Sequence, residues 1–249
     1  MFYYSGRILW LLICWVELAV FTVALYLLSF LPHTLIKSAY FRLFSIWCRF
    51  FVRALGVDLR LHQKNIKPIP KQFILIANHP SAFEDVGIPA LFKVYPVGKI
   101  EIRDWWWVGR INQAAGTLFV KRESRESRND AAGQIAQTLS EGNSVAIFPE
   151  GGCKGRRIYK DFRHGAFDIS LQTGVPILPV FIHYEAQQDF EWQPPHTLID
   201  MMWHFMTTQN NRANFYVYDA IDPQQFPDKK TYNEHVHNLY LQWQAKYLE

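Results

Sequence analysis

The chain begins with a long run of apolar positions. Between Ile8 and Leu31 there is one charged residue, Glu17, and neither proline nor glycine, and Pro32 follows directly. A helix over this range would be about 36 Å long at about 1.5 Å per residue, enough to cross the hydrocarbon core of a bilayer. A cleaved signal peptide has a shorter apolar run. The pattern therefore predicts an N-terminal membrane helix, and a re-entrant hairpin that never crosses is equally compatible with it.

The next segment, residues 33–55, combines many apolar positions with one narrow polar stripe. The stripe consists of Ser38, Arg42, Ser45, Arg49 and Arg53. Spacings of three and four residues put these side chains on one face of a helix. We expect such an amphipathic helix to lie in the headgroup interface of a membrane. The alternative is a helix packed on the globular part of the protein.

Short apolar runs alternate with helical periodicities after residue 56. The pattern predicts strands at residues 57–61, 73–77, 116–120, 144–148, 175–182 and 215–218, and helices at 83–92, 129–141, 162–173 and 232–247. This alternation favours an α/β fold with a mixed sheet flanked by helices. Pro89 suggests an early break or a kink in its helix. Pro176 and Pro179 suggest that their strand lies at an end or an edge of the sheet. Residues 186–214 are either a second lipid-facing surface or a packed loop.

Composition and charge indicate that the chain contacts lipid. Of the 249 residues, 49% are hydrophobic and 19% charged, which excludes disorder, and the aromatic content of 16% suits a protein that meets lipid. The net charge of +4 lies entirely in residues 1–56, because the remaining acidic and basic residues are equal in number. A basic excess beside an apolar segment points to anionic lipid rather than nucleic acid. The positive-inside bias places the globular domain on the cytoplasmic side. We therefore divide the chain into a membrane anchor with an interfacial helix, residues 1–56, and a globular domain, residues 57–249.

Candidate chemistry gathers where predicted strands end. The strand at 73–77 is followed by His79, Glu84 and Asp85. A carboxylate that accepts a hydrogen bond from one imidazole nitrogen raises the basicity of the other, which can then take a proton from a hydroxyl. A zinc site is disfavoured because no second histidine lies nearby, and a serine hydrolase because no G-x-S-x-G motif occurs. The alternative is a histidine whose hydrogen bonds only stabilise its own loop.

A glycine-rich basic segment follows the strand at 144–148. Gly151 and Gly152 would let the backbone approach an anion, and Lys154 and Arg156 begin a run of donors suited to phosphate. The spacing of a nucleotide P-loop is absent. A solvated basic turn is the alternative interpretation.

Four sequence blocks, in this order, resemble a known family. They are NHPSAFE, GTLFVKR, FPEGG and VPILPV, within residues 73–182. Together they resemble the glycerolipid acyltransferases of the 1-acylglycerol-3-phosphate (lysophosphatidic acid) type. The resemblance implies transfer of a fatty acyl group from a thioester, on coenzyme A or acyl carrier protein, to a lipid hydroxyl, without a metal or other cofactor. The acceptor would be a lysophospholipid in the membrane, with lysophosphatidic acid giving phosphatidic acid as the expected reaction.

The resemblance also assigns roles to residues. His79 would be the general base, aligned by the acid five residues on, which is Glu84; Asp85 is the alternate. The substrate-binding residues would be Arg122, Glu150, Gly151, Gly152, Lys154 and Arg156. The family usually has Asp at the position of Glu84, and Thr-Arg where this chain has Gly152 and Cys153. These departures leave open a different lyso-lipid acceptor, such as an amino-acid lipid, or a non-catalytic lipid-binding relative.

Overall fold

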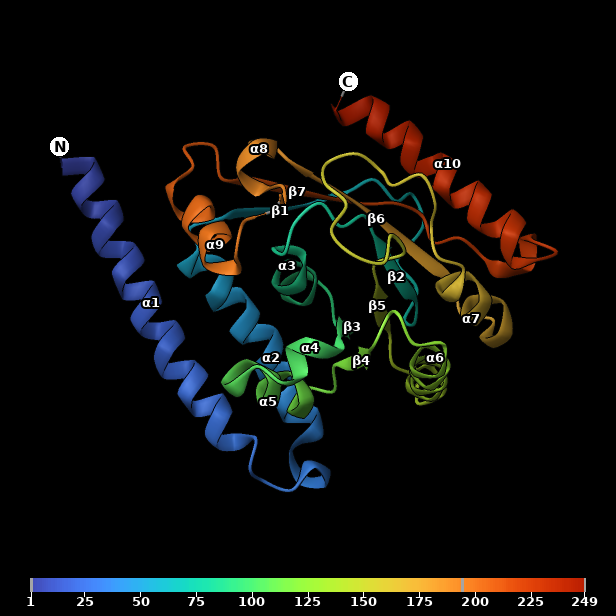
Figure 1. The fold of residues 1–249 in the computed structure, drawn as a ribbon, viewed down its shortest axis with the longest axis horizontal. Helices are drawn as coiled ribbons and strands as arrows, with labels where there is room; N and C mark the ends of the chain where they lie inside the picture. The colour runs from blue at the N-terminus through green and yellow to red at the C-terminus, as the bar shows by residue number, and fades with distance from the viewer. Residues whose placement is uncertain (1, 194, 249) are drawn as a thin grey trace.

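The computed structural model describes residues 2–193 and 195–248, and its centre is a seven-stranded sheet (Figure 1). The strand order is β1-β7-β6-β2-β5-β3-β4. The strands are β1 (Asp58–Gln63), β2 (Ile74–Ala77), β3 (Tyr95–Lys99), β4 (Leu118–Val120), β5 (Val145–Ile147), β6 (Ile177–Tyr184) and β7 (Arg212–Val217). All neighbouring pairs are parallel except β6 and β7, which are antiparallel. The predicted α/β fold with a mixed sheet is confirmed.

Helices cover both faces of this sheet. They are α1 (Phe2–Leu28), α2 (His33–Ala54), α3 (Glu84–Leu91), α4 (Ile100–Arg103), α5 (Trp106–Ala114), α6 (Arg125–Ser140), α7 (Gly165–Thr173), α8 (Gln187–Phe190), α9 (Leu198–Thr207) and α10 (Lys229–Leu248), with a 3-10 turn at Pro223–Gln225. Successive residues of a strand point to opposite faces. Leu75 and Ala77 of β2 therefore join a core with α1–α3, and Ile74 and Ile76 join a second core with α6, α7 and α10.

The position of β6 differs from the sequence prediction. Pro176 and Pro179 suggested an edge, but β6 lies inside the sheet between β7 and β2. The structure accommodates Pro179 because it sits next to an irregularity: between the Val180–Val217 pair and the Ile177–Ile221 bridge, the β7 side has one extra residue. Proline is tolerated at such bulges because no ladder N–H is needed there. Pro179 still accepts a hydrogen bond from the N–H of Tyr218 at 3.2 Å.

Helix α3 runs past its proline rather than breaking early. It ends at Leu91, two residues after Pro89. The last carbonyls of a helix lack intrahelical donors. Here two side chains of α2 supply them: the Ser45 hydroxyl donates to the Pro89 carbonyl at 2.7 Å, and Arg49 Nε donates to the Ala90 carbonyl at 3.0 Å.

These contacts also define the surroundings of α2. The helix packs between α1 and α3, with Phe44, Trp47 and Cys48 almost fully buried, as in the packed alternative. Contact of its outer face with a headgroup layer stays a prediction. Ser45 and Arg49 of its polar stripe bind α3, and Arg53 forms an ion pair with Glu17 of α1 at 3.3 Å. A helix that is apolar around most of its girth can pack on two neighbours, because burial of apolar surface stabilises the fold.

Candidate active site

The site is built at one edge of the sheet, where β2, β4, β5 and β6 all have their carboxyl ends. His79 follows β2, and its neighbour Asn78 fixes the backbone after this strand to β6. Asn78 Nδ2 donates to the Ile182 carbonyl at 2.9 Å, and Asn78 Oδ1 accepts from the Ile182 N–H at 2.7 Å. The imidazole of His79 stacks on Phe148 with ring centroids 4.1 Å apart. Its ring orientation is therefore fixed by both the backbone and the packing.

Glu84 holds one nitrogen of this imidazole. His79 Nδ1 lies 2.8 Å from Glu84 Oε2, which also accepts from the N–H of Ser81 at 3.0 Å. The other oxygen, Oε1, accepts a hydrogen bond from the Tyr184 hydroxyl at the end of β6. Three donors on one buried carboxylate fix its position, and a hydrogen on Nδ1 leaves the lone pair of Nε2 available to a substrate.

Burial controls the protonation of this pair. It lowers the pKa of His79 to about 4, opposed by the negative charge of Asp85 and assisted by the positive charge of Arg122. The imidazole is therefore neutral at physiological pH, as a general base must be. Burial also raises the pKa of Glu84 above its usual range, although the hydrogen bonds from Tyr184 and Ser81 act in the opposite direction.

Asp85 has a different environment. Its side chain reaches the surface, and within residues 2–193 and 195–248 it forms no hydrogen bond or ion pair. Desolvation raises the pKa of its carboxyl, opposed by the charges of His79 and Arg122. The structure thus brings Glu84, and not Asp85, to the imidazole, in agreement with the choice made from sequence spacing.

The FPEGG turn after β5 brings the backbone close to Arg122, which follows β4. Gly151 and Gly152 have φ values of 74° and 153°, a region that side chains rarely adopt. A Cβ atom at Gly152 would lie 3.1 Å from Arg122 NH1. The glycine therefore makes room for the guanidinium beside the turn, and Arg122 is close enough to influence the pKa of His79.

The side chains of the other predicted binding residues already contact other groups of the protein. Glu150 is buried and accepts backbone hydrogen bonds from His79 at 2.9 Å and Tyr159 at 3.2 Å, and burial raises its pKa to about 7. Arg156 pairs with Glu191 at 3.4 Å. Lys154 Nζ lies over the Tyr159 ring, 4.8 Å from its centroid. A substrate-lining role for these residues stays a prediction.

Sequence reasoning missed two residues of the site. Cys153 Sγ lies 3.5 Å from His79 Nε2 and 3.1 Å from the Ser81 carbonyl, so it borders the nitrogen that would accept a proton. Tyr184, which positions Glu84, is the second. The chain carried no local signal for Tyr184, because the strand was predicted to end at residue 182 and the contact with Glu84 joins residues 100 positions apart.

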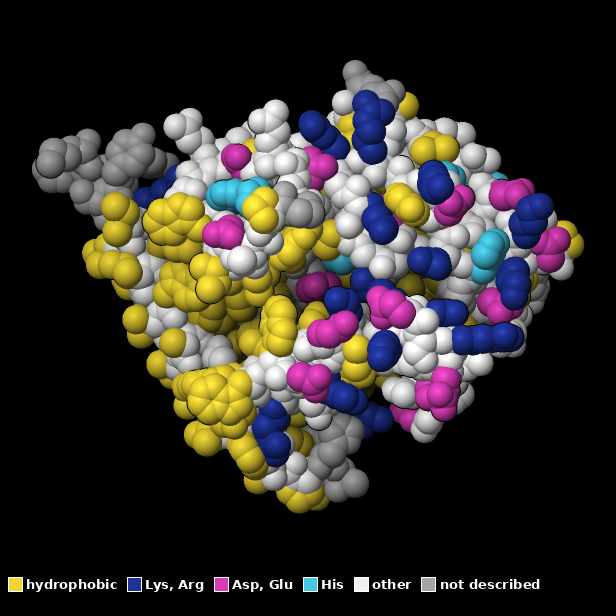
Figure 2. All heavy atoms as spheres, viewed as in Figure 1, with side chains coloured by type: hydrophobic (Ala, Val, Ile, Leu, Met, Phe, Trp, Pro, Cys, Tyr) yellow, Lys and Arg dark blue, Asp and Glu magenta, His cyan; other side chains and the backbone are white. Residues whose placement is uncertain are grey.

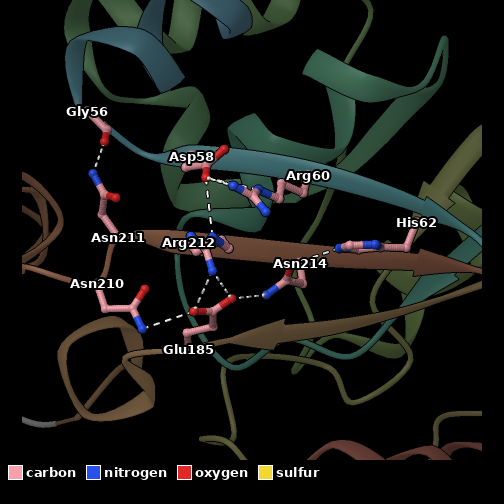
Figure 3. A network of polar contacts seen from close by, with 9 residues as sticks. All are labelled: Gly56, Asp58, Arg60, His62, Glu185, Asn210, Asn211, Arg212 and Asn214. Carbon is pink, nitrogen blue, oxygen red and sulfur yellow. Dashed lines mark hydrogen bonds and ion pairs between the residues drawn. The ribbon is translucent and has the colours of Figure 1, made fainter.

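A polar network beyond Tyr184 holds this end of β6 (Figure 3). Glu185 accepts from Arg212 NH1 at 2.9 and 3.1 Å and from Asn210 at 3.0 Å, and Arg212 also contacts Asp58 of β1. The three strands β6, β7 and β1 are thus tied together next to the tyrosine. Figure 2 shows a hollow near the middle of the view, with hydrophobic side chains on one side and charged side chains on the other.

Comparisons with known proteins agree with this arrangement. A family model described as Acyltransferase matches residues 58–183, about half of the chain. A 1-acyl-sn-glycerol-3-phosphate acyltransferase of Neisseria gonorrhoeae is 28% identical over 115 residues, 46% of this chain and 45% of that protein. A lyso-ornithine lipid O-acyltransferase of Pseudomonas aeruginosa is 30% identical over 155 residues, 62% of this chain and 58% of that protein. The matched regions thus span about half the length of these curated relatives.

The fold has a close counterpart among solved structures. The crystal structure of PlsC, the 1-acyl-sn-glycerophosphate (LPA) acyltransferase of Thermotoga maritima, superposes with a TM-score of 0.66. The superposition covers 97% of this chain and 96% of that one. At 18% sequence identity it shows a shared fold. Together with the family model, these findings show that the chain belongs to the acyltransferase family that includes the 1-acylglycerol-3-phosphate acyltransferases.

Proposed function

We propose that this protein is a membrane-bound O-acyltransferase that moves a fatty acyl group from acyl-CoA or acyl carrier protein to the free hydroxyl of a lyso-lipid. The observation that carries the proposal is the buried His79–Glu84 pair, with its 2.8 Å hydrogen bond. Lysophosphatidic acid is the first acceptor to test, with phosphatidic acid as the product.

The geometry supports a direct transfer. His79 Nε2 takes the proton of the acceptor hydroxyl while the oxygen attacks the thioester carbonyl. When the tetrahedral intermediate collapses, the thiolate leaves and takes a proton back from the imidazolium. Glu84 stabilises that transient imidazolium from the other side of the ring. Arg122, beside the FPEGG turn, supplies a cation for the anionic group of the acceptor.

Replacing the imidazole tests this mechanism. We expect His79→Gln to lower kcat about 10²- to 10⁴-fold, since it removes positioned proton transfer. His235→Gln, at an exposed position on α10, is the matched control and should keep full activity. The measurement is the transfer of a labelled acyl group from acyl-CoA to lysophosphatidic acid by purified protein, with the melting temperature of each variant as a check on folding. Equal rates for wild type and His79→Gln would refute the role of His79.

Membrane attachment and orientation belong to the same proposal. The helix Gly6–Leu28 is long and apolar enough to span a bilayer by length and composition. A lyso-lipid acceptor resides in the bilayer whereas the thioester donor is water-soluble, so the site has to lie at the interface, on the cytoplasmic side where the donor is found.

An amino-acid lipid is a second candidate acceptor. The observation that favours it is the exposed carboxylate of Asp85, which follows Glu84 directly and influences the pKa of His79. A carboxylate at this place repels a phosphate monoester and attracts an ammonium group. A relative that covers 74% of this chain, from Rhodobacter capsulatus, is also named a lyso-ornithine lipid O-acyltransferase.

A panel of acceptors with one labelled acyl-CoA separates the two candidates. If the acceptor carries an ammonium group, Asp85→Asn should lower kcat/KM for lyso-ornithine lipid about tenfold or more and leave or raise that for lysophosphatidic acid, a change of roughly 1.4 kcal/mol. Asp104→Asn, an exposed residue at the end of α4, is the control. Equal losses with both acceptors would assign Asp85 a structural role instead.

A further inference from the structure

Exposed hydrophobic side chains are concentrated on one part of this molecule. Among the described residues, the large hydrophobic side chains that are exposed belong to α1, the turn after it and the start of α2, to Ile46, to Trp105–Trp107 and to α9, with the exceptions of Leu61, Ile66 and Leu241. Scattered exposed hydrophobic residues are ordinary in soluble proteins, whereas a contiguous area marks a contact surface. Figure 2 shows hydrophobic side chains gathered in one yellow area on the side where Figure 1 places α1, α5 and α9, and this area reaches the hollow in the middle of the view.

Helix α9 is the first part of this area that the N-terminal segment does not explain. Its inner face is held by the core, where Met201 and Phe205 are almost fully buried. Its outer face carries Ile199 and Trp203, which are 77% and 64% exposed. These two residues are four apart and so form one apolar stripe along the helix. A capping box at Thr197 and Asp200 fixes the start of the helix, so the stripe is a rigid feature and not a frayed end.

Three tryptophans at the start of α5, Trp105–Trp107, form the second part. Trp106 is 77% exposed, and Trp105 and Trp107 are more than one third exposed. Trp107 contacts Tyr26 of α1 with ring centroids 5.7 Å apart, and Arg110 of α5 donates to the Ser29 hydroxyl at 2.9 Å. The tryptophans are therefore physically continuous with the apolar helix. Tryptophan is the residue most typical of the boundary between headgroups and acyl chains.

We propose that α9, through Ile199 and Trp203, and Trp105–Trp107 insert into the same membrane leaflet as α1, so that one lipid surface holds the protein at three places around the site. Three observations identify the occupant as a lipid leaflet. The area continues the outer face of α1, whose composition suits a bilayer. In Figure 2 it reaches the hollow in the middle of the view, whose other side carries charged side chains, as an interface between acyl chains and headgroups requires. It is rich in tryptophan at its margin.

Site-directed probes test the proposal directly. A cysteine introduced at Ile199 is labelled with an environment-sensitive fluorophore in full-length protein carrying Cys153→Ser; Cys14 and Cys48 are buried. The matched control is the same label at Leu241, which is exposed on α10. In vesicles of phosphatidylcholine and phosphatidylglycerol, we expect the label at 199 to be quenched by lipids with a nitroxide on the acyl chain and shielded from aqueous iodide. The label at 241 should behave in the opposite way.

The other outcomes overturn the proposal. Quenching of both labels by iodide means that α9 stays in water. Shielding at 199 from iodide and from nitroxide lipid alike means that a second copy of the chain covers the stripe. None of these readouts needs catalytic activity, so the result stands even if the proposed function fails.

A kinetic experiment adds the functional consequence. The double variant Ile199→Gln/Trp203→Gln should reduce kcat/KM about tenfold or more for an acceptor embedded in vesicles, because two large side chains lose their place in the lipid. It should leave the rate unchanged for a short-chain acceptor dissolved in water. Leu241→Gln should change neither value. Equal loss with both acceptors would mean that the variant damages the site itself, which would contradict a role in lipid contact.

Discussion

At the scale of single residues, the site depends on hydrogen bonds that position the long side chain of Glu84. Glu84 starts α3 and reaches back to His79, while Tyr184 and the Ser81 N–H take up the rest of its carboxylate. A glutamate has one more rotatable bond than an aspartate, and these contacts remove that freedom. The sequence spacing was sufficient to select Glu84 over Asp85. It could not indicate Tyr184, because that contact joins residues 100 positions apart.

The pH dependence of catalysis follows from the burial of His79. Its pKa is lowered to about 4, so the imidazole stays neutral throughout the range from pH 5 to 8. An unperturbed histidine would instead lose activity below about pH 6.5. We expect protonation of His79 to lower kcat/KM for an acyl-pantetheine donor only near pH 4 to 5, and not between pH 8 and 5.5. The measurement uses a Glu150→Gln background, because burial raises the pKa of Glu150 to about 7 and that carboxyl would otherwise titrate in the same range. An acid limb centred near pH 6.5 would show that the imidazole titrates as an exposed one.

At the scale of elements, periodicity predicted most of the strands and several helices, but it did not predict which elements pack against one another. The helix at 129–141 was placed correctly but starts earlier, at Arg125, where Ser124 caps it. Strand β3, Tyr95–Lys99, was missed because proline, glycine and lysine interrupt its apolar pattern. The short helices α4, α5, α8 and α9 were also missed, since four to ten residues give too few turns for a clear helical period.

The polar stripe of α2 illustrates what periodicity leaves open. Spacing established that Ser45, Arg49 and Arg53 share one face, but spacing cannot tell whether lipid headgroups or protein carbonyls meet that face. In the structure two of these side chains bind the final carbonyls of α3. A helix end with orphan carbonyls attracts donors in the same way as a phosphate layer does. The choice depended on tertiary packing.

The capping role of Ser45 leads to a stability prediction. Ser45→Ala removes the donor to the Pro89 carbonyl and should lower the free energy of unfolding by about 1 kcal/mol. Ser38→Ala, an exposed position in the same stripe, is the matched control and should change it by less than about 0.5 kcal/mol. Denaturant unfolding in detergent micelles measures both values. Equal stability of the two variants would mean that the bond to α3 contributes nothing net.

At the scale of the whole molecule, the division at residue 56 separates charge but not packing. The net positive charge lies before it, as the sequence indicated. Yet one hydrophobic core includes Leu18 of α1, Trp47 of α2 and Leu75 of β2. The reason is that α1 and α2 have two apolar sides, one for the protein and one left outward. Composition shows how apolar a segment is. Only the fold shows which part of its apolar surface packs in the core and which part faces outward.

This shared packing predicts the topology of the N-terminal helix. Helix α1 is bound to α2 over residues 17–25: Trp47 Nε1 donates to the Thr22 hydroxyl at 2.8 Å, Tyr40 donates to the Leu25 carbonyl at 3.0 Å, and Arg53 pairs with Glu17. If α1 crossed the bilayer, these partners and the catalytic domain attached to α2 would have to enter the hydrocarbon core with it, which polar backbone and charged side chains oppose. Figure 1 shows α1 running along one side of the molecule beside α2.

We therefore expect α1 to lie along one leaflet, with both of its ends on the side of the catalytic domain. A cysteine at Gly6, where a side chain meets no neighbour within 4 Å, and one at the exposed Glu234 of α10 report the two sides. In sealed vesicles with the cytoplasmic face outward, a membrane-impermeant maleimide should label both positions. In vesicles of the opposite orientation it should label neither until detergent is added. Labelling of Gly6→Cys and Glu234→Cys from opposite sides would establish a crossing helix, and the contacts between α1 and α2 would then have to break in the membrane.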